Sequence, residues 1–112
     1  MPMNTIAVAK SVLDDLVQRV LQVSAPVRIL LFGSAARGTF DGNSDLDILV
    51  VVPDGEHRGR TCEAIHRNLF GFPEPADVVV ATESDVEIYA DSPYLVIGPA
   101  LDEGVELYRR DG

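Results

Sequence analysis

Three aspartates have the spacing of a metal-binding site. Asp45 and Asp47 stand two residues apart at the start of an apolar run, and Asp77 heads a second apolar run. Side chains two apart on a β-strand project from one face, about 6.5 Å from each other along the backbone, while Leu46 between them points to the opposite face. Two neighbouring anions are unfavourable unless a cation neutralises them. If the Asp77 strand is a neighbour, the carboxylates suffice for two Mg²⁺ ions roughly 3.5–4 Å apart.

A Gly-Ser turn precedes the acid pair, with ten residues between Ser34 and Asp45. Gly33 ends a β-rich apolar run, and glycine lets the backbone approach a ligand closely. Ser34 is predicted to begin a helix, where free N–H groups collect anions and its hydroxyl can donate to a phosphate. Arg37, one helical turn further, can offer its guanidinium to the same phosphates.

Each half of this pattern alone has an ordinary structural explanation. Acids before a strand often cap turns, and Ser34 alone could be a simple helix N-cap. The combination is more specific, because it places phosphate donors and magnesium ligands close together in the chain. It predicts a site that binds a nucleoside triphosphate through Mg²⁺.

Two other phosphate or metal motifs do not fit the sequence. A P-loop needs Gly-Lys-Ser/Thr at its end, and here Gly38 is followed by Thr39. An EF-hand loop begun at Asp41 would need glycine where Leu46 stands and glutamate where Val52 stands.

Composition limits the classes of partner. The 112 residues carry 18 acids against 9 Lys and Arg, a formal net charge of −9. This charge disfavours extended nucleic-acid binding, whereas a basic protein partner, or solubility alone, fits it. No apolar run is long enough for a membrane helix, the first residues do not form a signal peptide, and the single cysteine, Cys62, suits a reducing cytoplasm.

The site must be positioned by strands that alternate with helices. The apolar spacing predicts helices and strands in the following order: a helix from about Thr5 to Leu21, a strand over 27–33, a helical turn from Ser34, a strand over 46–52, a helix over 58–70, a strand over 76–81, a helix over 83–90 with Thr82 as N-cap, a helical piece over 94–101 and an edge strand over 105–108. This order indicates an α/β fold, and the chain length predicts one domain, residues 1–112. The short first connection between strands predicts an antiparallel pair within a mixed sheet.

The combined motif resembles that of the minimal nucleotidyltransferase branch of the DNA polymerase β-like superfamily. The resemblance rests on Gly33-Ser34, ten residues, Asp45-x-Asp47 and a separated Asp77, in the local forms Gly-Ser-Ala-Ala-Arg-Gly and Asn-Ser-Asp-Leu-Asp-Ile-Leu-Val. It covers roughly residues 5–90. It implies the polymerase β-like nucleotidyltransferase fold, a small mixed β-sheet with helices packed on it.

The resemblance also implies a role for each matching residue. Asp45 and Asp47 would bind two Mg²⁺ ions, and Asp77 would bind one of them and help deprotonate an acceptor hydroxyl. The Gly33-Ser34 turn would hold the triphosphate of ATP, with Arg37 as a helper. The acceptor oxygen would attack the α-phosphate and pyrophosphate would leave.

The family suggests the acceptor by analogy. Larger relatives carry an added helical domain for the acceptor, for which this chain has no room. Single-domain members resemble antitoxins that are paired with a HEPN-domain ribonuclease toxin and attach AMP to a tyrosine hydroxyl of it. Two alternatives stay open: nucleotidyl transfer to an RNA end or a small molecule, and a non-catalytic partner that masks a toxin by contact. The presence of all three acids favours catalysis.

Overall fold

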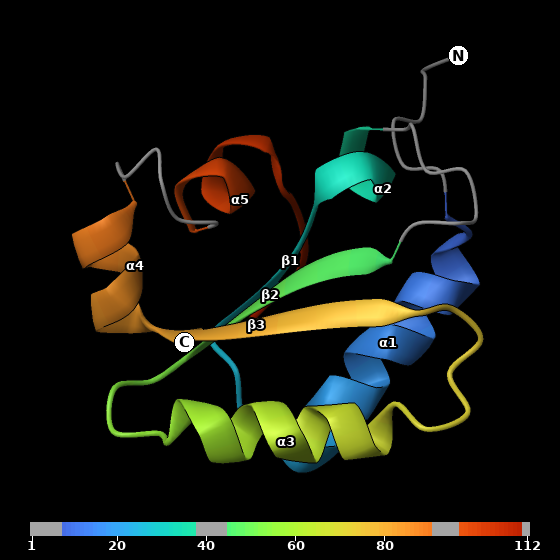
Figure 1. Cartoon of the computed structure of the whole chain (residues 1–112), viewed down its shortest axis with the longest axis horizontal. Coiled ribbons are helices and arrows are strands. Elements are labelled where there is room, and N and C mark those ends of the chain that lie inside the picture. The colour runs from blue at the N-terminus through green and yellow to red at the C-terminus, as the bar shows by residue number, and fades with distance from the viewer. Residues whose placement is uncertain (1–7, 38–44, 91–96, 111–112) are drawn as a thin grey trace.

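The computed structural model describes residues 8–37, 45–90 and 97–110. Figure 1 shows how the helices and strands of this part of the chain are arranged. Their bounds, in chain order, are α1 Lys10–Val23, β1 Arg28–Phe32, α2 Gly33–Arg37, β2 Leu46–Val52, α3 Arg58–Asn68, β3 Ala76–Thr82, α4 Glu83–Tyr89, α5 Ile97–Glu103 and β4 Val105–Arg109.

The strands form one mixed sheet in the order β3-β2-β1-β4. β1 runs antiparallel to both β2 and β4, whereas β2 and β3 are parallel. A parallel pair needs a crossover connection, and α3 supplies it between β2 and β3. The predicted α/β fold with a mixed sheet and an antiparallel first pair is therefore confirmed. Its consequence for the site is that β2 and β3 begin at the same end of the sheet.

Apolar side chains fill both faces of the sheet. On one face, α1 and α3 pack over a cluster that contains Leu16, Ile48 and Ile65, and on the other α5 packs over a smaller cluster around Leu49 and Ile97. Figure 1 shows α1 and α3 on one side of the strands and α5 on the other. β2 is apolar at almost every position because it is buried on both faces.

The first helix has the predicted apolar stripe but different ends. Leu13, Leu16, Val17 and Val20 are buried, as their spacing predicts. The helix begins at Lys10 and its N-cap is Ala9, which makes no side-chain cap bond, so the predicted start at Thr5 is wrong. Thr5 itself lies outside the described residues. The helix also continues to Val23, two residues beyond the predicted end.

The third helix is shorter than predicted because it stops at Asn68 rather than at residue 70. Ile65 is buried and Cys62 half-buried, whereas His66 is exposed. His57 is the N-cap: its Nδ1 accepts a hydrogen bond from the Arg60 N–H at 3.1 Å. Histidine is an unusual cap, so the sequence did not indicate it.

The C-terminal elements agree closely with the prediction. Thr82 is the N-cap of α4, as predicted, and forms a capping box with Asp85. α5, Ile97–Glu103, extends two residues beyond the predicted end at 101, and residues 94–96 of the predicted helical piece lie outside the described part. β4 is an edge strand, as predicted. No helix within the described ranges is both long and apolar enough to cross a membrane.

Candidate active site

Two of the predicted carboxylates stand side by side on adjacent strands. Asp47 of β2 and Asp77 of β3 are partners in the parallel register. Register partners on neighbouring strands project to the same face, so the two side chains share the face that carries Leu49 and Val79. Asp47 is half-buried and Asp77 is exposed. The sheet thus brings together two residues, Asp47 and Asp77, that are 30 positions apart in the sequence.

The third carboxylate, Asp45, immediately precedes β2 and is exposed. Leu46 is fully buried in the cluster on the opposite face, so alternation along the extended backbone puts Asp45 on the side of Asp47. The Leu46 N–H donates a hydrogen bond to the carbonyl of Pro75 at 2.8 Å. This bond fixes the start of β2, between the two acids, against the segment that leads into β3.

Gly33 links the Gly-Ser turn to the acids. Phe32, the last residue of β1, is the register partner of Asp47, and Gly33 follows it with φ 75°. A Cβ built on Gly33 would lie 3.1 Å from Asp47 Cγ and would overlap Asp47 Oδ2. The backbone of the turn therefore lies directly against the Asp47 carboxylate, and both the positive φ and the lack of space require glycine.

Ser34 and Arg37 both belong to α2, which starts without any intervening loop after β1. Ser34 is the second residue of this helix and Arg37 the last. The predicted helical turn at Ser34 is thus present. The side chains of Ser34 and Arg37 lie outside the described part of the structure, so their predicted contacts with phosphates stay predictions.

Asp47 and Asp77 are suitable Mg²⁺ ligands, both in their chemistry and in the way the backbone places them. Carboxylate oxygens are the hard ligands that Mg²⁺ prefers, and Asp47 and Asp77 offer them from one face. Because Gly33 has no Cβ, the Asp47 carboxylate can lie directly against the backbone of the turn. Among the described residues, no group of three or more His, Cys, Asp or Glu side chains is gathered closely enough to hold a metal ion. Metal binding by all three acids therefore stays a prediction, and it requires their side chains to converge.

The charge of Asp77 acts on a neighbouring thiol. Cys62 of α3 donates from Sγ to the carbonyl of Val78, 3.6 Å away. Burial raises the pKa of the Cys62 thiol, and the nearby Asp77 carboxylate raises it further. Cys62 is therefore held as a protonated thiol, a state that suits a structural residue and not a nucleophile.

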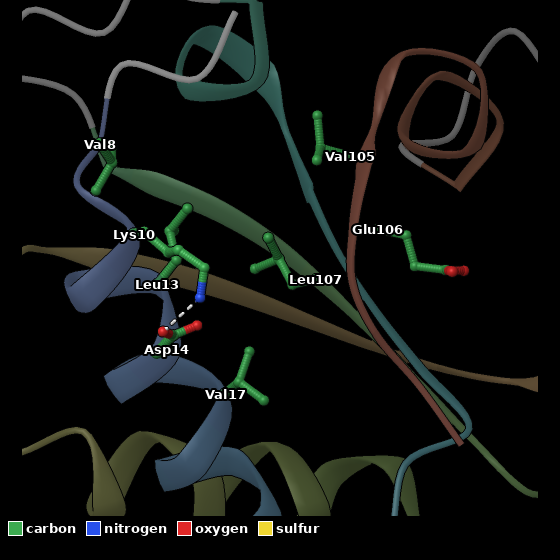
Figure 2. Close-up of a pocket in the computed structure, with 8 residues that line it drawn as sticks. All are labelled: Val8, Lys10, Leu13, Asp14, Val17, Val105, Glu106 and Leu107. Atoms are coloured by element: carbon green, nitrogen blue, oxygen red, sulfur yellow. Dashed lines mark hydrogen bonds and ion pairs between the residues drawn. The ribbon is translucent and has the colours of Figure 1, made fainter. Parts of the chain in front are cut away.

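A separate groove of about 400 Å³ lies between α1 and β4. Figure 2 shows its lining side chains, among them Lys10 and Asp14, which form an ion pair of 2.9 Å. The residues that line it are Val8, Lys10, Leu13, Asp14, Val17, Val105, Glu106 and Leu107. Leu13 and Val17 belong to the cluster on the α1 face, opposite the face of Asp47 and Asp77. This groove is therefore not part of the candidate active site.

Two neighbours of the acids were not identified from the sequence. Phe32 stands beside Asp47 through the antiparallel register, and Pro75 holds Leu46 through its carbonyl. Both contacts depend on strand order. The short connection predicted that the first two strands pair, but no periodicity or motif in a single sequence reports the register that places Phe32 beside Asp47 or the bond that Pro75 accepts.

Comparison with known proteins supports the fold and identifies the family. The fold is similar to that of a candidate nucleotidyltransferase from Sulfolobus solfataricus, with a TM-score of 0.60, 20% identity, and coverage of 89% of this chain and 79% of that chain. It is also similar to a structure solved as a toxin-antitoxin with AMP-PNP, with a TM-score of 0.54, 21% identity, and coverage of 88% and 74% of the two chains. No curated protein is significantly similar in sequence. The family model of the nucleotidyltransferase domain matches residues 10–100, and the chain therefore belongs to the nucleotidyltransferase domain family.

Proposed function

We propose that this chain transfers AMP from ATP to a hydroxyl group of a protein partner, most specifically a tyrosine of a HEPN-domain ribonuclease toxin. One observation carries the proposal. Asp47 and Asp77 are in register on one face, and the Gly33 backbone lies against the Asp47 carboxylate. A triphosphate held at the turn would therefore lie beside the acids that bind its metal ions.

Each residue has a defined task in this reaction. When bound, two Mg²⁺ ions would neutralise charge on the triphosphate and on the leaving pyrophosphate. Asp45 and Asp47 would hold them from β2. Backbone N–H groups of the Gly33-Ser34 turn would donate to phosphate oxygens, and the Ser34 hydroxyl and Arg37 would add further donors.

Asp77 would act on the acceptor. Its carboxylate would orient the acceptor hydroxyl and accept its proton while the hydroxyl oxygen forms a bond to the α-phosphorus. The bond from the α-phosphorus to the bridging oxygen of pyrophosphate would break at the same time, and pyrophosphate would leave. The rate enhancement comes from positioning and from preorganised charge, with no covalent intermediate on the chain.

A protein acceptor is supported by two observations. One similar structure was solved as a toxin-antitoxin with AMP-PNP, a non-hydrolysable ATP analogue. In addition, the net charge of −9 favours association with a basic protein and disfavours extended contact with RNA.

The test is transfer of a radiolabelled α-phosphate. The purified chain is incubated with labelled ATP, Mg²⁺ and an extract of its source cells, and products are separated into protein and RNA. We expect label on one protein band, and no label with the double variant Asp45→Asn and Asp47→Asn or after chelation of the metal. Mass spectrometry of the band would identify the modified residue as tyrosine.

The alternatives predict other outcomes of the same experiment. Label on RNA or on a small molecule would show that the acceptor is not a protein and would support the first alternative, nucleotidyl transfer to an RNA end or a small molecule. Tight binding of a partner without any transfer would indicate a masking antitoxin. Transfer at the parental rate by the double variant would show that the metal assignment is wrong.

A further inference from the structure

We infer that residues 69–75, the loop between α3 and β3, form the docking surface for the protein that receives the nucleotide. This inference rests on the proposed function and adds to it the surface that recognises the acceptor. It assigns to Phe70 the role of an apolar anchor that enters a cavity of the partner. The partner surface it fits is an apolar cavity with Lys or Arg at its rim.

Phe70 is the most exposed large apolar side chain of the described residues. Its exposed fraction is 92%, compared with 67% for Ile88, the next highest. An aromatic ring in water is unfavourable for the isolated chain, and aromatic side chains are enriched among residues that dominate binding energy at protein interfaces.

The backbone that carries this ring is held from both sides. Phe70 N–H donates to the carbonyl of Arg67 at 3.3 Å, and Phe72 N–H donates to that of Leu69 at 2.9 Å. Gly71 between them has φ 87°, which glycine adopts without strain.

Arg19 of α1 clamps the same segment to the body of the protein. Its Nη1 donates to the carbonyls of Asn68 at 3.1 Å and Phe70 at 3.0 Å, and its guanidinium lies 5.7 Å from the centroid of the Phe72 ring. Asn68 returns a hydrogen bond from Nδ2 to the carbonyl of Arg19 at 2.7 Å. Because these bonds already fix the backbone that carries the ring, docking would cost little backbone entropy, which favours affinity.

The loop is joined directly to the candidate active site. The carbonyl of Pro75 accepts from Leu46 N–H, between Asp45 and Asp47, and Asp77 follows two residues after Pro75. Pro73 and Pro75 restrict the backbone over this short path. A partner anchored on Phe70 would therefore be held at the end of the sheet where its hydroxyl must reach Asp77.

Charge selects a basic partner for this surface. Residues 69–75 contain one acid, Glu74, and no Lys or Arg, and Arg67, just before the loop, is paired with Glu63 at 3.0 Å. The nearby cation Arg19 also pairs with Asp15 at 3.1 Å, so its charge is already neutralised inside the clamp. Complementary potentials of this kind orient an encounter and exclude acidic partners.

The experiment compares label transfer by Phe70 variants. With labelled ATP, Mg²⁺ and source-cell extract, Phe70→Ser should reduce labelling of the protein band at least about tenfold, because it removes an anchor of hot-spot type. Phe70→Leu, which stays apolar, should retain most of the labelling. The dissociation constant for AMP-PNP with Mg²⁺ and the melting temperature should not change in either variant, since the ring is almost entirely exposed.

Ile88→Ser on α4 is the matched control. It replaces another exposed apolar side chain, and Figure 1 shows α4 at the end of the sheet away from the α3–β3 loop. Equal labelling by Phe70→Ser and the parent, or an equal loss with Ile88→Ser, would overturn the docking role. Failure of the parent to label any protein would instead remove the proposed function itself, so the two failures are distinct.

Discussion

The parallel strands β2 and β3 have aspartates near both ends, and the two groups of acids are placed differently in the fold. At the end where α4 begins, Asp54 accepts hydrogen bonds from Ser84 N–H at 2.9 Å and from Ser84 Oγ at 2.6 Å. Asp85 accepts from Thr82 N–H at 3.0 Å and pairs with Arg58 at 2.8 Å. At the other end, Asp47 and Asp77 are in register with each other.

Under the proposed function, this difference separates acids that stabilise the fold from acids that bind the ligand. The hydrogen bonds from Ser84 lower the pKa of Asp54, and the bond from Thr82 N–H, followed by Arg58, lowers the pKa of Asp85. These carboxylates are ionised and matched by donors of the chain. Asp47 and Asp77 are register partners on one face, and the proposed function would use them to bind a cation that arrives with the substrate.

The largest expected effect is the loss of transfer on changing one acid of the site. Asp77→Asn should lower the transfer rate by at least about a hundredfold, because the amide cannot accept the hydroxyl proton and is a poor metal ligand. Its metal-free melting temperature should stay unchanged or rise, since a repulsive charge is removed. The rate is measured with labelled ATP and the stability by calorimetry in chelator.

Asp54→Ala gives the contrasting result at the other end of the strands. It should leave the transfer rate unchanged and lower the melting temperature, because Ser84 loses both hydrogen bonds. If the two variants showed the same pattern, the division between structural and ligand-binding acids would be wrong.

A second prediction tests the contact between the turn and the acids. Gly33→Ala places a Cβ against the Asp47 carboxylate and also requires a positive φ, so it should lower transfer by roughly tenfold or more through a displacement of that group. Gly55→Ala is the matched control. Gly55 has φ 98°, but a Cβ added there would have nothing within 4 Å, so this change carries only the backbone cost of about 1–2 kcal/mol. Both variants are compared by urea unfolding and by transfer rate, and equal transfer by the two would remove the special role of the Gly33 contact.

Much of this architecture was predictable because the relevant signals are local. The apolar run Leu46–Val52 indicated the correct strand because a strand buried on both faces is continuously apolar. The Thr82 and Asp85 capping box was predictable because both partners lie within one helical turn. The alternation that puts Asp45 and Asp47 on one side and Leu46 on the other follows from strand geometry alone.

The features that were missed are contacts between distant residues. The bonds from Arg19 to the carbonyls of Asn68 and Phe70 join positions 49 and 51 apart, and nothing in the sequence marks Arg19 as different from another surface cation. The start of α1 was misplaced because the apolar spacing extends upstream of Lys10 while no capping side chain marks the true boundary.

A third prediction concerns stability at the structural end. Thr82→Ala removes the hydroxyl that accepts from Asp85 N–H at 3.1 Å, so it should lower the free energy of unfolding by about 1 kcal/mol. The transfer rate should stay at the parental value, because the cap lies at the opposite end of β3 from Asp77. Thr82→Ser keeps an accepting hydroxyl and should recover most of the loss. An equal loss for Ala and Ser would assign the effect to the methyl group and not to the cap.

The smallest expected effect is a dependence on pH of the stability that Asp85 contributes. The pKa of Asp85 lies below its ordinary value of 3.8 in the folded chain. The folded state therefore binds this proton more weakly than the unfolded state, so the stabilisation is complete above that ordinary value and is lost as pH falls through the folded pKa. Asp85→Asn should accordingly melt below the parent at about pH 6, and the difference between them should narrow as pH falls toward about 3. Melting curves of both proteins across this range measure the difference. A constant gap would mean that the lost stability comes from packing around Thr82 and Arg58 and not from the charge of the carboxylate.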